Sequence, residues 1–410
     1  YEGRVQKLGC EHPQTMRAAY GLADCLSALE RYEEAIELRR IELAWCEKEN
    51  GPDDPDTLFS LHMLGVDLVD AKQPEAGLEL LQDCLKRQQQ LFGTTHERTL
   101  STFARVLDAL SDLERHAEAI ALSESVQQAL EADRGRKDPE VLNQISNQAL
   151  LHERLEQLEV AERLWRRCLE CHERSLQSDD ASMLRCIKRL ARVLFQLDKS
   201  GEAESLYRRA LSIQKDSLGL NHPEALNTAY ALAEVLSQQQ RHAEAIPLRR
   251  RELAWCRQQN GDTDPGTLAS INDLAIDLRE KGELEEAEAL FRELLAARLQ
   301  VMDPSDFGIG LALGGLAKTL EAASKLEDAL SYSQQALVHR QTHEGPDAWW
   351  TNRERLDLAR VLHKLSRGSE ARAMLQELTT SMNRNDDPDD DDRQMIKEAE
   401  KLMRSIEETR

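Results

Sequence analysis

NGPDDPDTL, residues Asn50 to Leu58, joins two helical patterns and returns in altered form every 42 residues. LGCEHPQT (Leu8 to Thr15) and LGLNHPEAL (Leu218 to Leu226) are two further versions of it. Glycine past the end of a helical pattern acts as a C-cap, because it takes the left-handed conformation without a side-chain penalty. Asp or His three residues later serves as the N-cap of the next helix, and proline follows at the first helical position. Each such segment is therefore predicted to end one helix and start another.

The glycine of this segment marks the repeat along the chain. Gln177 and Asp303 stand where two further glycines are expected. Fixed self-similarity at such a period is typical of stacked copies of one supersecondary unit, not of one closed core. The glycines that keep the spacing are Gly9, Gly51, Gly93, Gly135, Gly219, Gly261 and Gly345.

Between the glycine loops, two apolar patterns recur with helical spacing. The first helix has a column of small residues, such as Ala23 and Gly65, three positions before a column of leucines. The second helix has its own small-residue column, which includes Ala35 and Gly77. Small residues facing large ones let two antiparallel helices approach closely. The fold is therefore predicted to be an all-α solenoid of about nine helical hairpins.

This pattern resembles the tetratricopeptide repeat family, in the long-repeat form of kinesin light chains and many bacterial signalling proteins. The small residues of both helices and the three loops quoted above carry the resemblance, over about residues 8–380. It implies a right-handed solenoid whose first helices line a concave groove. It also implies a non-catalytic scaffold that binds a peptide or a partner protein in that groove. The repeats near Gln177 and Asp303 match the family pattern least well.

Both ends depart from the nine repeats, which are assigned to residues 9–385. Residues 1–8 resemble the last turns of a second helix, and because the chain has no initiator Met we expect it to be part of a longer protein. Residues 386–410 contain the aspartates Asp386, Asp387 and Asp389 to Asp392, followed by a predicted terminal capping helix. Calcium binding is the alternative for the aspartates, but the glycine and spacing of a calcium loop are absent. The apolar face of this helix consists of Met395, Ala399, Leu402, Met403 and Ile406.

One block of repeats is duplicated. Residues Ala35–Cys46 and Ala245–Cys256 are identical at ten of twelve positions. They stand 210 residues apart, which is five repeat lengths.

Composition limits the class of partner. Lys and Arg number 53 against 75 Asp and Glu, which gives a formal net charge of −22. Such a surface repels nucleic-acid phosphates and anionic membranes, and no apolar run reaches membrane-spanning length. Eight cysteines scattered over many repeats favour reduced thiols and a cytoplasmic location. We therefore expect protein partners and neither nucleic acid nor membrane.

No nucleotide-binding loop, nucleophile elbow or kinase signature is visible, so no catalytic residue and no cofactor is predicted in this segment. The closest approach to a metal motif is Cys168-Leu-Glu-Cys171 followed by His172. Structural zinc needs four converging ligands, and no second pair stands at a matching spacing. These residues are therefore expected to pack in the core, and no metal is predicted. Trp45 and Trp255, which share one column, are expected to be packing aromatics.

By the resemblance, the groove-facing columns are those of Arg17, Tyr20 and Asp24. In the fifth repeat this face becomes basic, and spacings of three and four place its cations on one helical face. A solvated helix face is one interpretation. The other is that the cluster binds carboxylates of an acidic peptide through charge-assisted hydrogen bonds, as kinesin light chain grooves accept acidic peptides containing tryptophan. The cluster consists of Arg185, Lys188, Arg189 and Arg192.

Other repeats add candidates on the same face. The alternative function is the regulatory or sensor region of a larger multidomain enzyme, such as a bacterial kinase, a nucleotide-binding switch protein or a caspase-like protease. In that case the groove would contact another domain of the same protein. The additional groove candidates are Asn143, Ser146, Asn227, Tyr230, Asn272, Arg353 and Arg360.

Overall fold

The computed structural model describes residues 1–136, 138–174, 180–384 and 389–408, and the regular elements among them are all helices. The chain divides into two compact units, Tyr1–Lys199 and Ser200–Arg410. The division falls between the two helices of the fifth predicted hairpin. The loop around Gln177 and the residues Asp386, Asp387 and Pro388 lie outside the described residues.

The helices of the first unit are α1 (Glu2–Leu8), α2 (Pro13–Ala28), α3 (Tyr32–Asn50), α4 (Pro55–Asp70), α5 (Pro74–Phe92), α6 (Glu97–Asp112), α7 (His116–Arg134), α8 (Pro139–Arg154), α9 (Leu158–Glu173) and α10 (Asp180–Gln196). Those of the second unit are α11 (Ser200–Ser217), α12 (Pro223–Gln238), α13 (His242–Asn260), α14 (Pro265–Lys281), α15 (Leu284–Val301), α16 (Phe307–Ala322), α17 (Leu326–His343), α18 (Trp349–Lys364), α19 (Gly368–Met382) and α20 (Asp390–Glu408).

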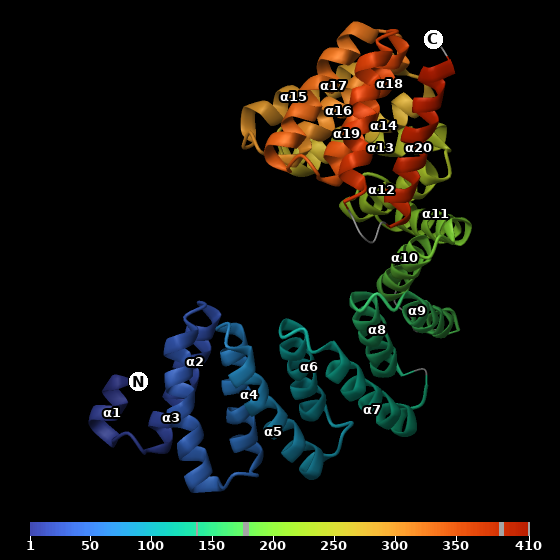
Figure 1. The fold of residues 1–410 in the computed structure, drawn as a ribbon. Helices are drawn as coiled ribbons and strands as arrows, with labels where there is room; N and C mark the ends of the chain where they lie inside the picture. Colours follow the sequence, from blue (N-terminus) through green and yellow to red (C-terminus); the bar gives the residue numbers. More distant parts are fainter. Residues whose placement is uncertain (137, 175–179, 385–388, 409–410) are drawn as a thin grey trace. The chain divides into compact units, whose positions relative to one another are not determined.

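Within each unit, every helix packs on the helices before and after it (Figure 1). Helix α3 packs on α4, in the next hairpin, as extensively as on α2, its partner in the same hairpin. The apolar core therefore continues from repeat to repeat instead of closing within one of them. This arrangement is an α-solenoid, as the repeat period predicted.

The loops between hairpins have the predicted caps. Asp54 and Asp264 each accept a hydrogen bond at 2.9 Å from the backbone N–H two residues later. His12 and His222 do the same through Nδ1, at 3.2 and 3.3 Å. Asp306 is different, because its carboxylate accepts from Arg298 and makes no side-chain cap. The prediction that Asp or His starts the first helix is thus confirmed for these aspartates and histidines except Asp306.

The glycine that ends each second helix has an unusual backbone. Gly51 has φ of 92° and ψ of 162°, and Gly261 has 89° and 170°. The predicted positive φ is confirmed, but ψ is extended rather than left-handed helical, because the chain must turn away from the helix end to reach the next N-cap. Residues with a side chain hardly ever adopt this region.

Small residues bring the two helices of a hairpin together. Ala23 of α2 and Ala35 of α3 are both completely buried. In the next hairpin, a methyl group on Gly77 would lie 2.8 Å from the carbonyl oxygen of Gly65 and 2.6 Å from a methyl of Val69. These contacts confirm the close approach predicted from the small-residue columns.

Helix α20 is the predicted capping helix. It packs on α18 and α19 and buries Met395, Ala399 and Ile406. Leu402 and Met403 are partly buried against the same core. The end of the second unit is therefore covered by a helix outside the repeat pattern.

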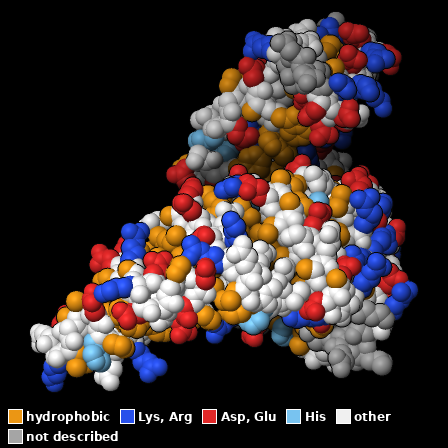
Figure 2. Space-filling view, turned by 90° about the horizontal axis from the view of Figure 1, so that it is seen from below, with side chains coloured by type: hydrophobic (Ala, Val, Ile, Leu, Met, Phe, Trp, Pro, Cys, Tyr) orange, Lys and Arg blue, Asp and Glu red, His pale blue; other side chains and the backbone are white. Residues whose placement is uncertain are grey.

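Charged side chains of both signs are interspersed over the face seen in Figure 2. Among the described residues, charged side chains of neighbouring repeats pair, as Arg105 does with Asp70 at 2.6 Å and Lys199 with Glu162 at 2.6 Å. None of the helices in the described residues has both the length and the apolar composition that a membrane span requires.

Replacing Gly51 by alanine is expected to lower the free energy of unfolding by about 1–3 kcal/mol, because its backbone conformation is strained for any side chain. Urea or thermal unfolding followed by circular dichroism measures the change. Gly21→Ala is the matched control, since Gly21 lies exposed within α2 and an added Cβ would meet nothing within 4 Å. Alanine there should raise stability by about 0.5–1 kcal/mol. Equal effects of the two substitutions would contradict the assignment.

Candidate functional site

The predicted groove columns border a cavity of about 600 Å³ in the first unit. Arg17 and Tyr20 of α2, Phe59 of α4 and Trp45 of α3 are among the residues that line it. The ring centroids of Tyr20 and Phe59 lie 6.0 Å apart, and Phe59 is 40% exposed. Trp45 is half-buried and its Nε1 donates to the carbonyl oxygen of Glu11 at 2.9 Å, so this expected packing residue is also a wall of the cavity. The cavity thus offers aromatic surface to an apolar side chain.

A buried arginine next to Tyr20 links three helices. Arg39 of α3 is completely buried, and its Nε donates to Asp67 of α4 at 3.1 Å. The same guanidinium pairs with Asp24 of α2 and lies 4.7 Å from the centroid of the Tyr20 ring. Ser27 donates to the other oxygen of Asp67 at 2.8 Å. These contacts fix the position of Tyr20, which lines the cavity.

A related network stands 210 residues later, in the second unit. Arg249 donates to Asp277 at 2.6 Å and to Asp273 at 3.1 Å, and lies 5.1 Å from the ring centroid of Tyr230. The Tyr230 hydroxyl donates to Asp273 at 2.7 Å, and burial raises the pKa of Tyr230 to about 12. Asn272 also donates to Asp273, at 3.3 Å. Tyr230 and Asn272, both half-buried groove candidates, are therefore held by polar contacts of the stack itself.

Helix α10 carries the four predicted cations of the fifth repeat, here called the basic face of α10. Arg185 and Arg192 are exposed, and Lys188 and Arg189 are half-buried. Arg189 and Arg192 both approach one carboxylate, Glu153 of α8, at 3.6 and 3.3 Å. One carboxylate therefore serves two of the four cations.

The two predicted arginines of the ninth repeat do not face an open groove. Arg360 of α18 donates to Glu398 of α20 at 2.5 Å, and Arg353 lies 3.5 Å from the same carboxylate. Both side chains also pair with Asp357 of their own helix. Arg353 and Arg360 therefore stay partly exposed, at 28% and 33%, but already pair with the capping helix, so their predicted role in binding a partner remains a prediction.

The remaining groove candidates differ in exposure. Asn143 and Asn227 are exposed, as predicted. Ser146 is buried and donates to the carbonyl oxygen of Leu142 at 2.9 Å, so its expected place on the groove surface is wrong. Its position lies close enough to the apolar stripe of α8 to be covered by the next helix.

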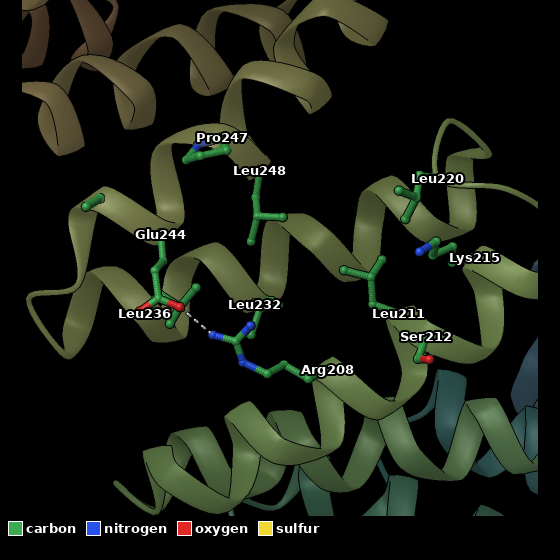
Figure 3. A pocket seen from close by; sticks show the side chains of 11 residues that line it. Arg208, Leu211, Ser212, Lys215, Leu220, Leu232, Leu236, Glu244, Pro247 and Leu248 are labelled. Carbon is green, nitrogen blue, oxygen red and sulfur yellow. Dashed lines mark hydrogen bonds and ion pairs between the residues drawn. The ribbon is translucent and has the colours of Figure 1, made fainter.

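A second cavity, of about 510 Å³, lies among α11, α12 and α13 (Figure 3). Leu211, Leu232 and Leu248 line it, and Arg208 donates to Glu244 across its edge at 2.7 Å. Pro247 of α13 also borders the cavity, and a proline within a helix cannot donate the usual backbone hydrogen bond. This cavity was not predicted from the sequence, in which the proline within a helical pattern is its one visible signal.

Three metal-ligating side chains meet between α9 and α10. Cys168 and His172 come from α9 and Cys186 from α10, and their ligand atoms all lie within 4.8 Å of one another. The two sulfur atoms are 3.0 Å apart in a buried site. This contact lowers the pKa of Cys168 to about 6 and raises that of Cys186. Cys168 and Cys186 are buried as expected of core residues, but no sequence pattern predicted that Cys186 lies beside Cys168 and His172.

Comparison with known proteins identifies the repeat. The sequence profile described as Tetratricopeptide repeat matches residues 14–86, 140–216 and 221–300, which is more than half of the chain. A search of curated protein sequences gave no match.

Solved structures share the fold at low sequence identity. A tetratricopeptide repeat protein from Parabacteroides merdae is 12% identical with a TM-score of 0.50, covering 73% of this chain and 98% of that one. A Signal Transduction ATPase with Numerous Domains (STAND) protein with a tetratricopeptide repeat sensor, from Pyrococcus horikoshii, is 13% identical with a TM-score of 0.51. That match covers 84% of this chain and 52% of the other. A putative kinesin light chain from Podosopora anserina, with nearly identical repeats, is 21% identical with a TM-score of 0.45, covering 50% of this chain and 97% of that one.

The helical hairpins, their continuous core and the matched profile agree. The tetratricopeptide fold is a general scaffold for protein interactions, and a fold of this kind is typically non-catalytic. This chain belongs to the tetratricopeptide repeat family.

Proposed function

We propose that this chain is a non-catalytic scaffold that binds an acidic segment of a partner protein on the exposed faces of its first helices. The observation that carries the proposal is the contact between α18 and α20. Arg353 and Arg360 hold the carboxylate of Glu398, which belongs to a helix outside the repeats. These columns of the first helix can therefore bind a carboxylate of a docked segment.

The basic face of α10 has a pair of arginines at the equivalent positions, with a further cation between them. Arg185 and Arg192 stand in the same columns as Arg353 and Arg360, four repeat lengths earlier. The position between them is Arg189 in the fifth repeat but Asp357 in the ninth. The basic face therefore lacks the local aspartate that neutralises the ninth repeat. Charge-assisted hydrogen bonds from such arginines are the strong kind, which suits an acidic ligand.

The cavity among α2, α3 and α4 supplies the complementary apolar contact. Its aromatic wall of Tyr20, Trp45 and Phe59 lies in the same unit and borders the same helix columns. Aromatic side chains bury a large area and anchor peptide ligands in pockets of this kind. The proposed ligand is therefore acidic with at least one aromatic residue.

The alternative is a sensor region that binds another domain of a larger enzyme. The STAND protein supports it only through a shared fold and the sensor role that its description states. Crosslinking mass spectrometry on the natural protein separates the two proposals, because crosslinks from the basic face of α10 would lead either to another protein or to the same polypeptide.

Charge reversal tests the basic face directly. Arg185→Glu, Lys188→Glu and Arg192→Glu together should weaken binding of a fluorescent peptide rich in Asp and Glu, with one tryptophan, at least about tenfold at low salt. Fluorescence anisotropy measures the affinity. A milder variant, Arg185→Gln with Arg192→Gln, avoids placing new carboxylates beside Glu153, and circular dichroism verifies that each variant folds.

The matched control reverses three exposed cations on second helices of the same unit: Arg40→Glu, Lys86→Glu and Arg163→Glu. It changes the net charge by the same amount and should leave the affinity nearly unchanged. Equal losses in both triple variants, or binding that is insensitive to salt, would refute a specific role of the basic face.

Removing part of the aromatic wall should lower the affinity for the same peptide by a smaller factor than the charge reversal does. Phe59→Ala is expected to cost about three- to tenfold in affinity, because the contact of two aromatic rings contributes about 0.5–1.5 kcal/mol. Leu29→Ala is the control, since Leu29 is 67% exposed and does not line the cavity. A peptide in which alanine replaces tryptophan should bind wild type and Phe59→Ala with equal affinity. If Phe59→Ala still lowers the affinity for this peptide, the cavity is not the site that binds the tryptophan.

A further inference from the structure

The contact between consecutive hairpins brings three particular side chains together, and this set is called the seam triplet here. In the first repeat it consists of Glu42 and Cys46 of α3 and Ser60 of α4. Ser60 donates to Glu42 at 3.1 Å, and the Cys46 sulfur lies 3.7 Å from the Ser60 oxygen. Two residues one helical turn apart thus meet one residue of the next helix.

The sixth repeat has the same triplet in the second unit. Ser270 donates to Glu252 at 2.7 Å, and Cys256 lies 3.1 Å from the same carboxylate. The contact among these three positions recurs in two repeats and therefore follows from the repeat geometry.

In the fourth repeat the seam triplet consists entirely of metal-ligating residues. Cys168, His172 and Cys186 occupy the positions of Glu42, Cys46 and Ser60, three repeat lengths later. Their three ligand atoms are buried and mutually within 4.8 Å. No carboxylate remains in the triplet, and thiolate with imidazole is the ligand set that zinc and copper(I) prefer.

We propose that Cys168, His172 and Cys186 form a binding site for a thiophilic metal ion, zinc(II) in the first place, with a fourth position left for water or a small ligand. Thiolates about 2.3 Å from a tetrahedral zinc ion lie nearly 4 Å apart. The two sulfur atoms, 3.0 Å apart, need to separate by less than about 1 Å to reach that spacing. Rotation of buried cysteine side chains by a small angle suffices.

The surroundings support a ligand role for Cys168. The Ser146 oxygen lies 3.4 Å from the Cys168 sulfur, and rotation of its hydroxyl away from the carbonyl oxygen of Leu142 would let it donate to a metal-bound thiolate. The site joins α9 to α10, so a bound ion would link the fourth repeat to the first helix of the fifth. Because a ligand that binds only the folded state stabilises it, metal should raise the unfolding temperature.

The test uses the full chain, reduced and then stripped of metal. Titration with Co²⁺ should give one equivalent of binding with thiolate-to-cobalt charge-transfer absorption, and Zn²⁺ should displace it. Cys168→Ser and Cys186→Ser should each weaken Zn²⁺ binding by more than the ~10- to 100-fold that outer partners of a metal site contribute. The unfolding temperature of wild type should rise with Zn²⁺, and that of these variants should not.

Cys84→Ser is the matched control. Cys84 is buried, stands in the same column as Cys168, and has Gln88 and Thr102 at the other two triplet positions. This variant should keep the cobalt spectrum and the shift in unfolding temperature. The proposal is overturned if wild type binds less than about one-fifth of an equivalent, if Cys168→Ser binds as well as wild type, or if Cys168 and Cys186 form a disulfide that excludes the metal under reducing conditions.

Discussion

The close contact between a small side chain on one helix and the backbone of the next holds this protein together. Ala23 and Ala35 are completely buried at such contacts, and Gly65 and Gly77 allow an even closer approach. A single hairpin cannot bury enough apolar surface to be stable, so each pair of helices depends on its neighbours. The polar groups that lie in these contacts, from the Arg39 network to the seam triplets, are then fixed by the stacking itself.

The sequence allowed the helices and their order to be predicted because those features are local. A glycine, an Asp or His cap and, in many loops, a proline specify the turn without reference to distant residues. The backbone at Gly51 and Gly261 differed in ψ, which depends on how the next helix is reached, and Asp306 pairs with Arg298 instead of capping its helix. The capping helix was equally visible, because Met395, Ala399 and Ile406 share one face of a helix.

The surface was harder to predict, because exposure depends on neighbouring helices. Arg353 and Arg360 have the same helical positions as Arg185 and Arg192, yet Arg353 and Arg360 pair with Glu398 of α20 and are half-buried, whereas Arg185 and Arg192 are exposed. The predicted exposure of Ser146 was wrong because the packing of neighbouring helices buries its side chain. The cluster of Cys168, His172 and Cys186 could not be predicted from the sequence. Its prediction depends on the fact that two residues one helical turn apart meet a third residue of the next helix. The contact between Glu42 and Ser60 shows this convergence only in the three-dimensional structure.

The duplicated Arg39 and Arg249 networks have a consequence for the search for the native state during folding. Ala35–Cys46 and Ala245–Cys256 are identical at ten of twelve positions, and α3 docked on α14 instead of α4 would be a registration error of five repeats. The ion pairs discriminate against such a mistake: Arg39 takes its second carboxylate from α2, whereas Arg249 takes it from α14. Helix α13 placed on α4 would find Met63 where Asp273 belongs, leaving the Tyr230 hydroxyl without its acceptor. The differences between the two copies therefore favour the correct order of the duplicated repeats.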